Sequence, residues 1–168
     1  MDAIYIPHLT KLKEQTEVIQ VQDFLPGLTT LTPIRGKLRI QLRGNFLEVS
    51  VKAETIITLT CHRCLQQYNH RLVVDTSEII WLDETATKLD DAPLEREVAL
   101  EDLVESLPPL GYFHPSEWLY EQLCLEIPQR QLCDAECAGI QSNDAGNVIE
   151  PKIDRRWASL EMLKKQLP

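Results

Sequence analysis

The sequence lacks the motifs and segments that mark several large classes of protein. Only six of its 168 residues are glycine, and the motifs GxGxxG, GxxxxGK[ST] and GxSxG do not occur. These absences argue against nucleotide-binding enzymes and serine hydrolases. No window approaches 18 uninterrupted apolar residues, and the N-terminus lacks the basic and apolar regions of a secretory signal. We therefore expect a cytoplasmic protein without a membrane span.

Catalytic groupings are scarce as well. The four histidines are scattered without a partner pattern, and adjacent acids such as Glu101 and Asp102 are expected by chance among 26 acidic residues. We therefore expect no enzyme. Aromatic residues make up 6% of the chain and do not interleave with the basic ones, which argues against a stacking platform for single-stranded nucleic acid.

Charge is distributed unevenly along the chain. The net charge of −9 argues against bulk electrostatic attraction to nucleic acid or to an anionic membrane. However, residues 33–72 carry seven basic and two acidic groups, whereas residues 73–126 carry two basic and 14 acidic groups. The basic block is either ordinary surface or a phosphate-facing patch. Its candidate nucleic-acid contacts are Arg35, Lys37, Arg39, Arg43, Arg63 and Arg71.

Alternating apolar and polar residues predict an antiparallel meander of four or five strands over residues 15–82. In residues 34–42 apolar side chains stand at every second position, and residues 46–53 follow the same pattern. Gly44 and Asn45 separate the two runs, and such a two-residue break is typical of a β-hairpin. The apolar pair Ile56 and Ile57 then predicts a shift in the pattern. One face of this sheet would cover the core and the other would face solvent or a partner.

Helices are expected in the second half, so the predicted fold class is α+β. Residues 83–97 are dense in charge and poor in strong apolar residues, which predicts an acidic mobile loop. Two or three helices are predicted, and the candidate segments are residues 98–107, 116–127 (with Ser116 as N-cap) and 154–167. We thus expect one domain over residues 1–168, in which a β-rich part precedes a helical part over residues 98–168.

The five cysteines contain the most specific local motif. Cys61-His-Arg-Cys64 is matched downstream by Cys133-Asp-Ala-Glu-Cys137, and four thiolates are the ligand set of a structural zinc site. The gap between the pairs exceeds the spacing of a zinc finger, so a shared ion would clip the sheet to the region after the second predicted helix. The fifth cysteine, Cys124, falls among apolar residues of that helix and is expected in the core.

Other interpretations of the first pair stay open. Cys61 and Cys64 are also compatible with small apolar residues that cap a strand. They are compatible with a redox pair too, although the sequence after Cys64 continues as a strand instead of opening a helix. His62, His70 and His114 are substitute metal ligands.

Six further segments occur in a fixed order after the basic strands. They are TCHRCLQQY, an acidic loop, EDLVESLPPL, CLEIP, CDAECAGI and IDRRWASLEMLKK. From about residue 15 to the end, the chain resembles the YceD family, the large ribosomal RNA subunit accumulation proteins of bacteria and plastids. Many members continue the second cysteine motif with Leu and Cys, where this chain has Ile140 and Gln141. Four cysteines are still enough for one tetrahedral ion.

The resemblance implies a non-enzymatic role in large-subunit ribosomal RNA accumulation, and hence in ribosome biogenesis. The expected partner is the ribosomal RNA precursor or a basic large-subunit ribosomal protein. Of these two partners, the basic ribosomal protein is favoured over the RNA, because the acids of residues 73–126 complement a cationic partner better than seven dispersed bases complement RNA. The competing hypothesis is a thiol redox or metal-handling protein that uses Cys61 and Cys64.

Overall fold

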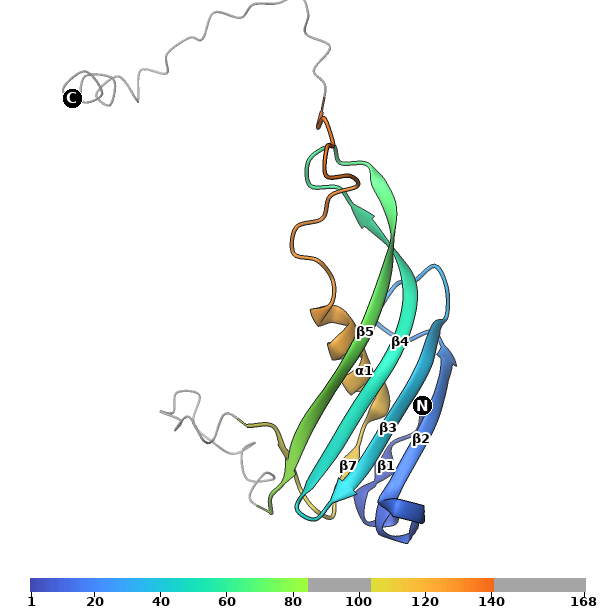
Figure 1. Ribbon diagram of the computed structural model, residues 1–168, viewed down its shortest axis with the longest axis vertical. Helices are drawn as coiled ribbons and strands as arrows, with labels where there is room; N and C mark the ends of the chain where they lie inside the picture. The colour runs from blue at the N-terminus through green and yellow to red at the C-terminus, as the bar shows by residue number, and fades with distance from the viewer. Residues whose placement is uncertain (85–103, 141–168) are drawn as a thin grey trace, which may run out of the picture.

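A long, twisted five-stranded sheet dominates the computed structural model, which describes residues 1–84 and 104–140 (Figure 1). The strand order is β2-β3-β4-β5-β6, antiparallel throughout except for the parallel pair β5-β6. Its strands are β2 (Thr16–Asp23), β3 (Ile34–Arg43), β4 (Phe46–Thr60), β5 (Gln67–Leu82) and β6 (Ser106–Leu107). A second, two-stranded sheet pairs β1 (Ile4–Tyr5) with β7 (Tyr112–Phe113). The predicted antiparallel sheet is confirmed.

The period-two pattern sorts the side chains onto two faces of the large sheet. In β3 the even positions Ile34, Leu38, Ile40 and Leu42 are buried, as predicted. The turn Gly44-Asn45 joins β3 to β4, and Gly44 adopts φ +65°, a conformation that glycine reaches without strain. The hairpin prediction is thereby confirmed.

The predicted shift at Ile56 is wrong, because the alternation in β4 runs unbroken to Cys61. Every second residue of β4 is buried, and Thr55 occupies one of these positions as a buried polar side chain among apolar ones. Its hydroxyl donates a hydrogen bond of 2.7 Å to the carbonyl oxygen of Thr32, and the Ile56 N–H donates to the Thr32 hydroxyl. The chain before β3 thus satisfies the buried hydroxyl, which a hydrophobicity pattern does not register.

One α-helix, α1 (Pro115–Leu125), lies across one face of the sheet (Figure 1). Its buried Trp118, Leu119 and Leu123 join the core. Two 3-10 segments, η1 (Ile6–Lys11) and η2 (Lys13–Gln15), precede β2, and η1 adds Ile6 and Leu9 to the same core. Within the described residues, no helix is long and apolar enough to cross a membrane.

The helical predictions need two corrections. His114, not Ser116, is the N-cap of α1, and the Ser116 hydroxyl donates instead to the carbonyl oxygen of Met1. The sequence predicts a helix over residues 98–107, but the end of this segment that the structure describes forms strand β6. The N–H groups of Trp81 and Asp83, in and just after β5, donate hydrogen bonds to the carbonyl oxygens of Glu105 and Leu107. These non-local hydrogen bonds override local helix propensity. The expected two or three helices therefore reduce to one in residues 1–84 and 104–140.

Other sequence expectations fall outside the described residues. The acidic loop expected over residues 83–97 is described only at Asp83 and Glu84, and the tail helix expected over residues 154–167 is not described.

Acidic side chains mark the junction of β5, α1 and the segment before β6. Glu78 accepts hydrogen bonds from the Trp118 indole N–H at 2.6 Å and from the Gln122 amide at 3.0 Å, which ties α1 to β5. Burial, and then the charges of Glu78 and Glu121, raise the pKa of Glu105 above its usual value. A negatively charged Glu105 is therefore unfavourable in the folded protein.

Replacing Glu105 with Gln should stabilise the protein at pH 7. Because the folded-state pKa of Glu105 is raised, its favourable contribution is complete below the unfolded-state pKa and is lost as the pH rises through the folded-state value. Glu105→Gln should thus raise the melting temperature at pH 7, and the gain should vanish at acidic pH. Glu17→Gln, on the edge strand β2, is the control. A gain that is equal at both pH values would contradict the prediction.

Candidate metal centre and basic sheet face

The four cysteines of the two motifs meet at the far end of the β4-β5 hairpin. Cys61 and Cys64 lie in the turn between these strands, and the chain that follows α1 runs to the same end of the molecule (Figure 1). That chain contributes Cys133 and Cys137, so that all four sulfur atoms lie within 4.8 Å of one another. Segments some 70 residues apart in sequence are thus brought together, as a shared ion would require.

The sulfur positions suit one tetrahedral ion. Cys61 Sγ lies 3.9 Å from Cys137 Sγ, and Cys64 Sγ lies 3.7 Å from Cys133 Sγ. Four sulfurs at about 2.3 Å from a shared zinc ion would be about 3.8 Å apart at tetrahedral angles. A disulfide requires sulfurs at about 2.05 Å, so the cysteines are free thiols.

Backbone hydrogen bonds fold the first motif into a tight knuckle. The N–H of Arg63 donates to Cys61 Sγ at 3.4 Å, and the N–H of Leu65 donates to the Cys61 carbonyl oxygen at 2.9 Å. Leu65 adopts φ +62°, a left-handed conformation that turns the chain back into β5. Both sulfurs consequently point to the same side of the turn.

The second motif is held against this knuckle by Arg63 and His62. The Arg63 guanidinium donates to the carbonyl oxygens of Cys137 at 2.8 Å and Ala135 at 3.4 Å. The His62 N–H donates to the Gln131 carbonyl oxygen at 2.8 Å, while His62 Nδ1 accepts from the Gln131 N–H at 3.4 Å. Arg63, which the sequence groups with the RNA contacts, is thus engaged in joining the two cysteine motifs.

The thiols of Cys61 and Cys133 differ strongly in pKa. Backbone N–H groups of Cys133 and Cys64 lower the pKa of the Cys61 thiol to about 6. The thiol of Cys137, followed by those of Cys61 and Cys64, raises the pKa of Cys133 to about 12. Cys61 is therefore the more acidic thiol of the two. A divalent cation would supply the charge needed to hold four thiolates together.

Among the described residues, the cluster that could hold a metal ion contains cysteines only. Cys124 lies on α1, half-buried and away from the cluster, beside Tyr120. The thiol of Cys124 raises the pKa of the Tyr120 hydroxyl. His62, His70 and His114, named above as substitute ligands, are not members of the cluster.

The remaining basic residues divide into paired and unpaired groups on the sheet face that α1 does not cover. Three of them form ion pairs across neighbouring strands or within the β3-β4 hairpin: Arg43 with Glu48, Lys52 with Asp75 at 2.9 Å, and Arg71 with Glu54. Arg35, Lys37 and Arg39 form no ion pair within the described part of the chain, and they alternate along β3.

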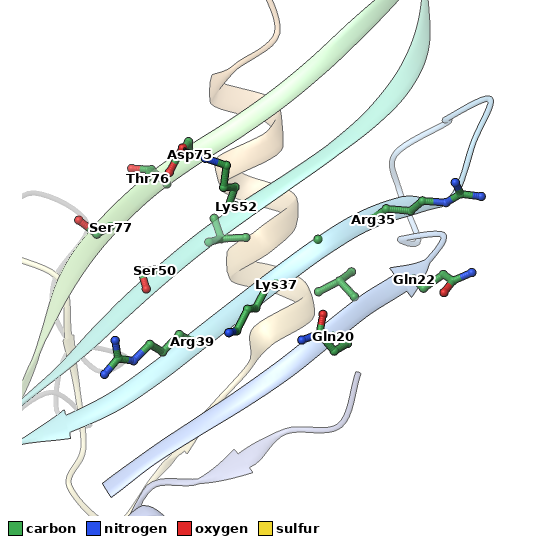
Figure 2. A pocket seen from close by; sticks show the side chains of 13 residues that line it. Gln20, Gln22, Arg35, Lys37, Arg39, Ser50, Lys52, Asp75, Thr76 and Ser77 are labelled. Atoms are coloured by element: carbon green, nitrogen blue, oxygen red, sulfur yellow. Dashed lines mark ion pairs between the residues drawn. The ribbon is translucent and has the colours of Figure 1, made fainter. Parts of the chain in front are cut away.

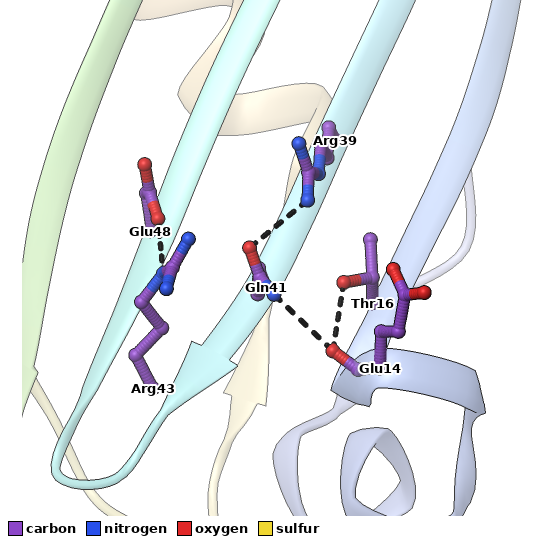
Figure 3. Close-up of polar contacts among 6 residues, drawn as sticks. All are labelled: Glu14, Thr16, Arg39, Gln41, Arg43 and Glu48. Atoms are coloured by element: carbon purple, nitrogen blue, oxygen red, sulfur yellow. Dashed lines mark hydrogen bonds and ion pairs between the residues drawn. The ribbon is translucent and has the colours of Figure 1, made fainter.

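These three cations border a shallow hollow of about 750 Å³ on the open face (Figure 2). Polar side chains surround them, among which are Gln20 of β2, Ser50 of β4 and Ser77 of β5. Figure 3 shows that Arg39 is positioned by a neutral group: its guanidinium donates to Gln41 Oε1 at 3.0 Å, and the Gln41 amide donates to the Glu14 carbonyl oxygen at 3.2 Å. No carboxylate therefore cancels the charge of Arg39.

The sheet also brings two aromatic side chains to this face, which the sequence analysis missed. Phe46 opposes Trp81 in the β4-β5 register, with ring centroids 5.5 Å apart, and Trp81 is 42% exposed. Both lie in the cross-strand row that begins with Arg43. Aromatic and basic residues that are separate in sequence are thus neighbours in the fold. Only the strand register would have shown this, and composition does not give it.

The family model described as "Large ribosomal RNA subunit accumulation protein YceD" matches residues 49–164. The chain belongs to the YceD family. The match includes all four clustered cysteines but begins within β4, so that β2, β3 and the three unpaired cations lie outside it. No curated protein and no solved structure matches the chain.

A titration with Co²⁺ tests whether the four clustered cysteines bind one metal ion. Metal-free protein titrated with Co²⁺ should develop the absorption of a tetrahedral thiolate complex, saturating at one ion per chain. Cys133→Ser should weaken binding by at least about tenfold, because the remaining sulfurs no longer complete the coordination sphere. Cys124→Ser is the matched control and should bind like the unchanged protein. Saturation at two ions per chain would show that the two motifs do not share an ion.

Proposed function

We propose that this protein is a non-enzymatic factor that supports the accumulation of large-subunit ribosomal RNA, and thereby ribosome biogenesis. It would act in the cytoplasm by binding ribosomal RNA or a basic ribosomal protein. The observation that carries the proposal is the match to the YceD family over residues 49–164. The family's description supplies the process, and the exposed face of the sheet offers a surface for a macromolecular partner.

The cysteine cluster supports a structural role for zinc within this function. Cys61, Cys64, Cys133 and Cys137 would hold the ion, and sulfur-only tetrahedral sets favour zinc over magnesium, calcium or manganese. Four protein ligands leave no open position for a substrate or a water molecule, which is the arrangement of structural and not catalytic zinc. The bound ion would fasten the chain after α1 to the tip of the β4-β5 hairpin.

A thiol redox function is the second candidate, and the lowered pKa of Cys61 is the observation in its favour. Against it, Cys61 is fully buried, and its sulfur lies within 4.8 Å of all three other sulfurs of the cluster. A cluster of four mutually close sulfurs from two motifs suits a shared ion better than a reactive Cys-x-x-Cys pair.

Metal removal should destabilise the protein at the clipped end. Chelation, or the double substitution Cys61→Ser and Cys133→Ser, should lower the melting temperature by about 10 °C, because metal binding contributes free energy to the folded state only. Limited proteolysis should then cut within residues 126–140. The Cys124→Ser protein, treated identically, controls for the loss of a thiol. An unchanged melting temperature after complete metal removal would exclude a structural ion.

Cells depleted of this protein should show a selective loss of large ribosomal subunits with accumulated precursor of the large-subunit RNA. Sucrose gradients and RNA blots measure the two effects. Wild-type and Cys124→Ser proteins should restore large subunits, whereas the Cys61→Ser, Cys133→Ser protein should restore them poorly. Normal ribosome profiles in depleted cells would contradict the proposed function and favour the redox alternative.

A further inference from the structure

We infer that the open face of the large sheet binds single-stranded RNA. The phosphates would lie along Arg35, Lys37 and Arg39 of β3, and an unpaired base would stack on Trp81 at the end of the same face. The choice of RNA as the polyanion rests on the proposed function. The location of the surface rests on charge and geometry alone, since β3 lies outside the residues matched by the family.

Charge pairing on β2–β5 leaves a local excess of positive charge. The strand register places three carboxylates on the open face, and each is bonded to a base of that face: Glu48 to Arg43, Glu54 to Arg71 and Asp75 to Lys52. The three bases of β3 remain uncompensated. Like charges also meet across the strands, since Lys37 stands directly opposite Lys52. Because Asp75 pairs with Lys52, Lys37 is the lysine of the two that has no ion-pair partner among the described residues.

The spacing of the three cations suits a nucleotide chain. Arg35, Lys37 and Arg39 occupy alternate positions of one strand and are therefore about 6.8 Å apart. This separation is comparable to that of successive phosphates in an extended strand of RNA. Gln20 and Ser50 flank the row from β2 and β4 and offer the amide and hydroxyl groups that commonly contact phosphate and sugar (Figure 2).

The aromatic pair supplies a site for a base at one end of the row. Phe46 and Trp81 lie two cross-strand rows beyond Arg39, at a distance of about 14 Å along the strand. Trp81 is 42% exposed and the nearby Ile79 is 50% exposed, which leaves apolar surface open beside a polar hollow. Proteins that bind single-stranded nucleic acid commonly combine a row of cations with an exposed aromatic ring, and this face of the sheet offers both.

Single-stranded RNA fits these features better than duplex RNA or a basic protein does. In a duplex the bases are stacked inside the helix, out of reach of Trp81. A basic protein would need unpaired carboxylates, and those of β2–β5 on this face are already paired. Of the 14 acids in residues 73–126 that favoured a protein partner, six lie in residues 85–103, outside the described residues, and Asp75 is the one that β5 places on this face.

Fluorescence anisotropy with the metal-loaded, full-length protein tests the inference. The probe is a short labelled RNA of mixed sequence, either single-stranded or annealed to its complement. The test variant removes the three unpaired cations: Arg35→Gln, Lys37→Gln and Arg39→Gln. The matched control removes three exposed cations from other parts of the molecule: Lys11→Gln, Lys13→Gln and Arg130→Gln. Both variants change the net charge equally, and melting temperature and metal content verify their folding.

The unchanged protein should prefer the single strand. The test variant should bind it at least about tenfold more weakly, and the slope of log affinity against log salt should fall by about 2, as expected for three lost phosphate contacts. Trp81→Ala should weaken binding about tenfold without altering that slope, because stacking carries no charge. The control variant should retain most of the affinity.

Several outcomes would overturn the inference. These are a preference for duplex RNA, an equal loss in the test and control variants, and binding of basic ribosomal proteins without any affinity for RNA. Its failure is distinguishable from that of the proposed function. Loss of large subunits in depleted cells, with RNA affinity unaffected by the test variant, contradicts this surface alone. Normal large subunits together with site-dependent RNA binding contradict the proposed function and support the surface.

Discussion

The antiparallel pairing of β4 with β5 is the interaction on which the rest of the molecule depends. The register runs without interruption from Phe46 opposite Trp81 to Thr60 opposite Gln67. Because side chains alternate between faces, this one register decides which residues enter the core and which stay outside, and a slip by one residue would exchange the two sets. It also sets the two ends of the ladder. The aromatic pair closes one end, and the turn with Cys61 and Cys64 closes the other.

The paired strands β4 and β5 extend beyond the end of β3, and this explains the position of the cysteine cluster. In the strand registers, β3 reaches β4 only as far as Glu54, and beyond that point the chain before β3 takes over through Thr32 and the bridge from Thr30 to Ile57. The tip of the hairpin therefore has little sheet on either side. The chain after α1 returns to cover it, where Arg63 and the four sulfurs hold that chain in place. A metal ion held by the four sulfurs would compensate for the small apolar contact available at such a tip.

Local patterns in the sequence account for strands β2–β5, the β3-β4 hairpin and the proximity of the cysteines, because each depends on side-chain period or motif spacing. Three of the features that did not follow from the sequence depend on contacts between separate segments. The backbone of β5 draws Ser106 and Leu107 into a strand. Thr55 occupies a core position because Thr32 accepts its hydrogen bond. Cross-strand ion pairs separate the basic residues into neutralised and free groups, and only the register reveals which acid faces which base.

This separation reconciles the net charge of −9 with the proposed surface for RNA. Exposed charges interact appreciably only within about 8–10 Å at physiological salt, so an RNA strand on the open face responds to the groups of that face and not to the whole protein. There, each carboxylate of β2–β5 is offset by a base, and Arg35, Lys37 and Arg39 stand in excess. The acids elsewhere act at longer range and weakly. They disfavour approach of RNA to other parts of the molecule, so that the acidic composition adds specificity to a small basic surface instead of opposing it.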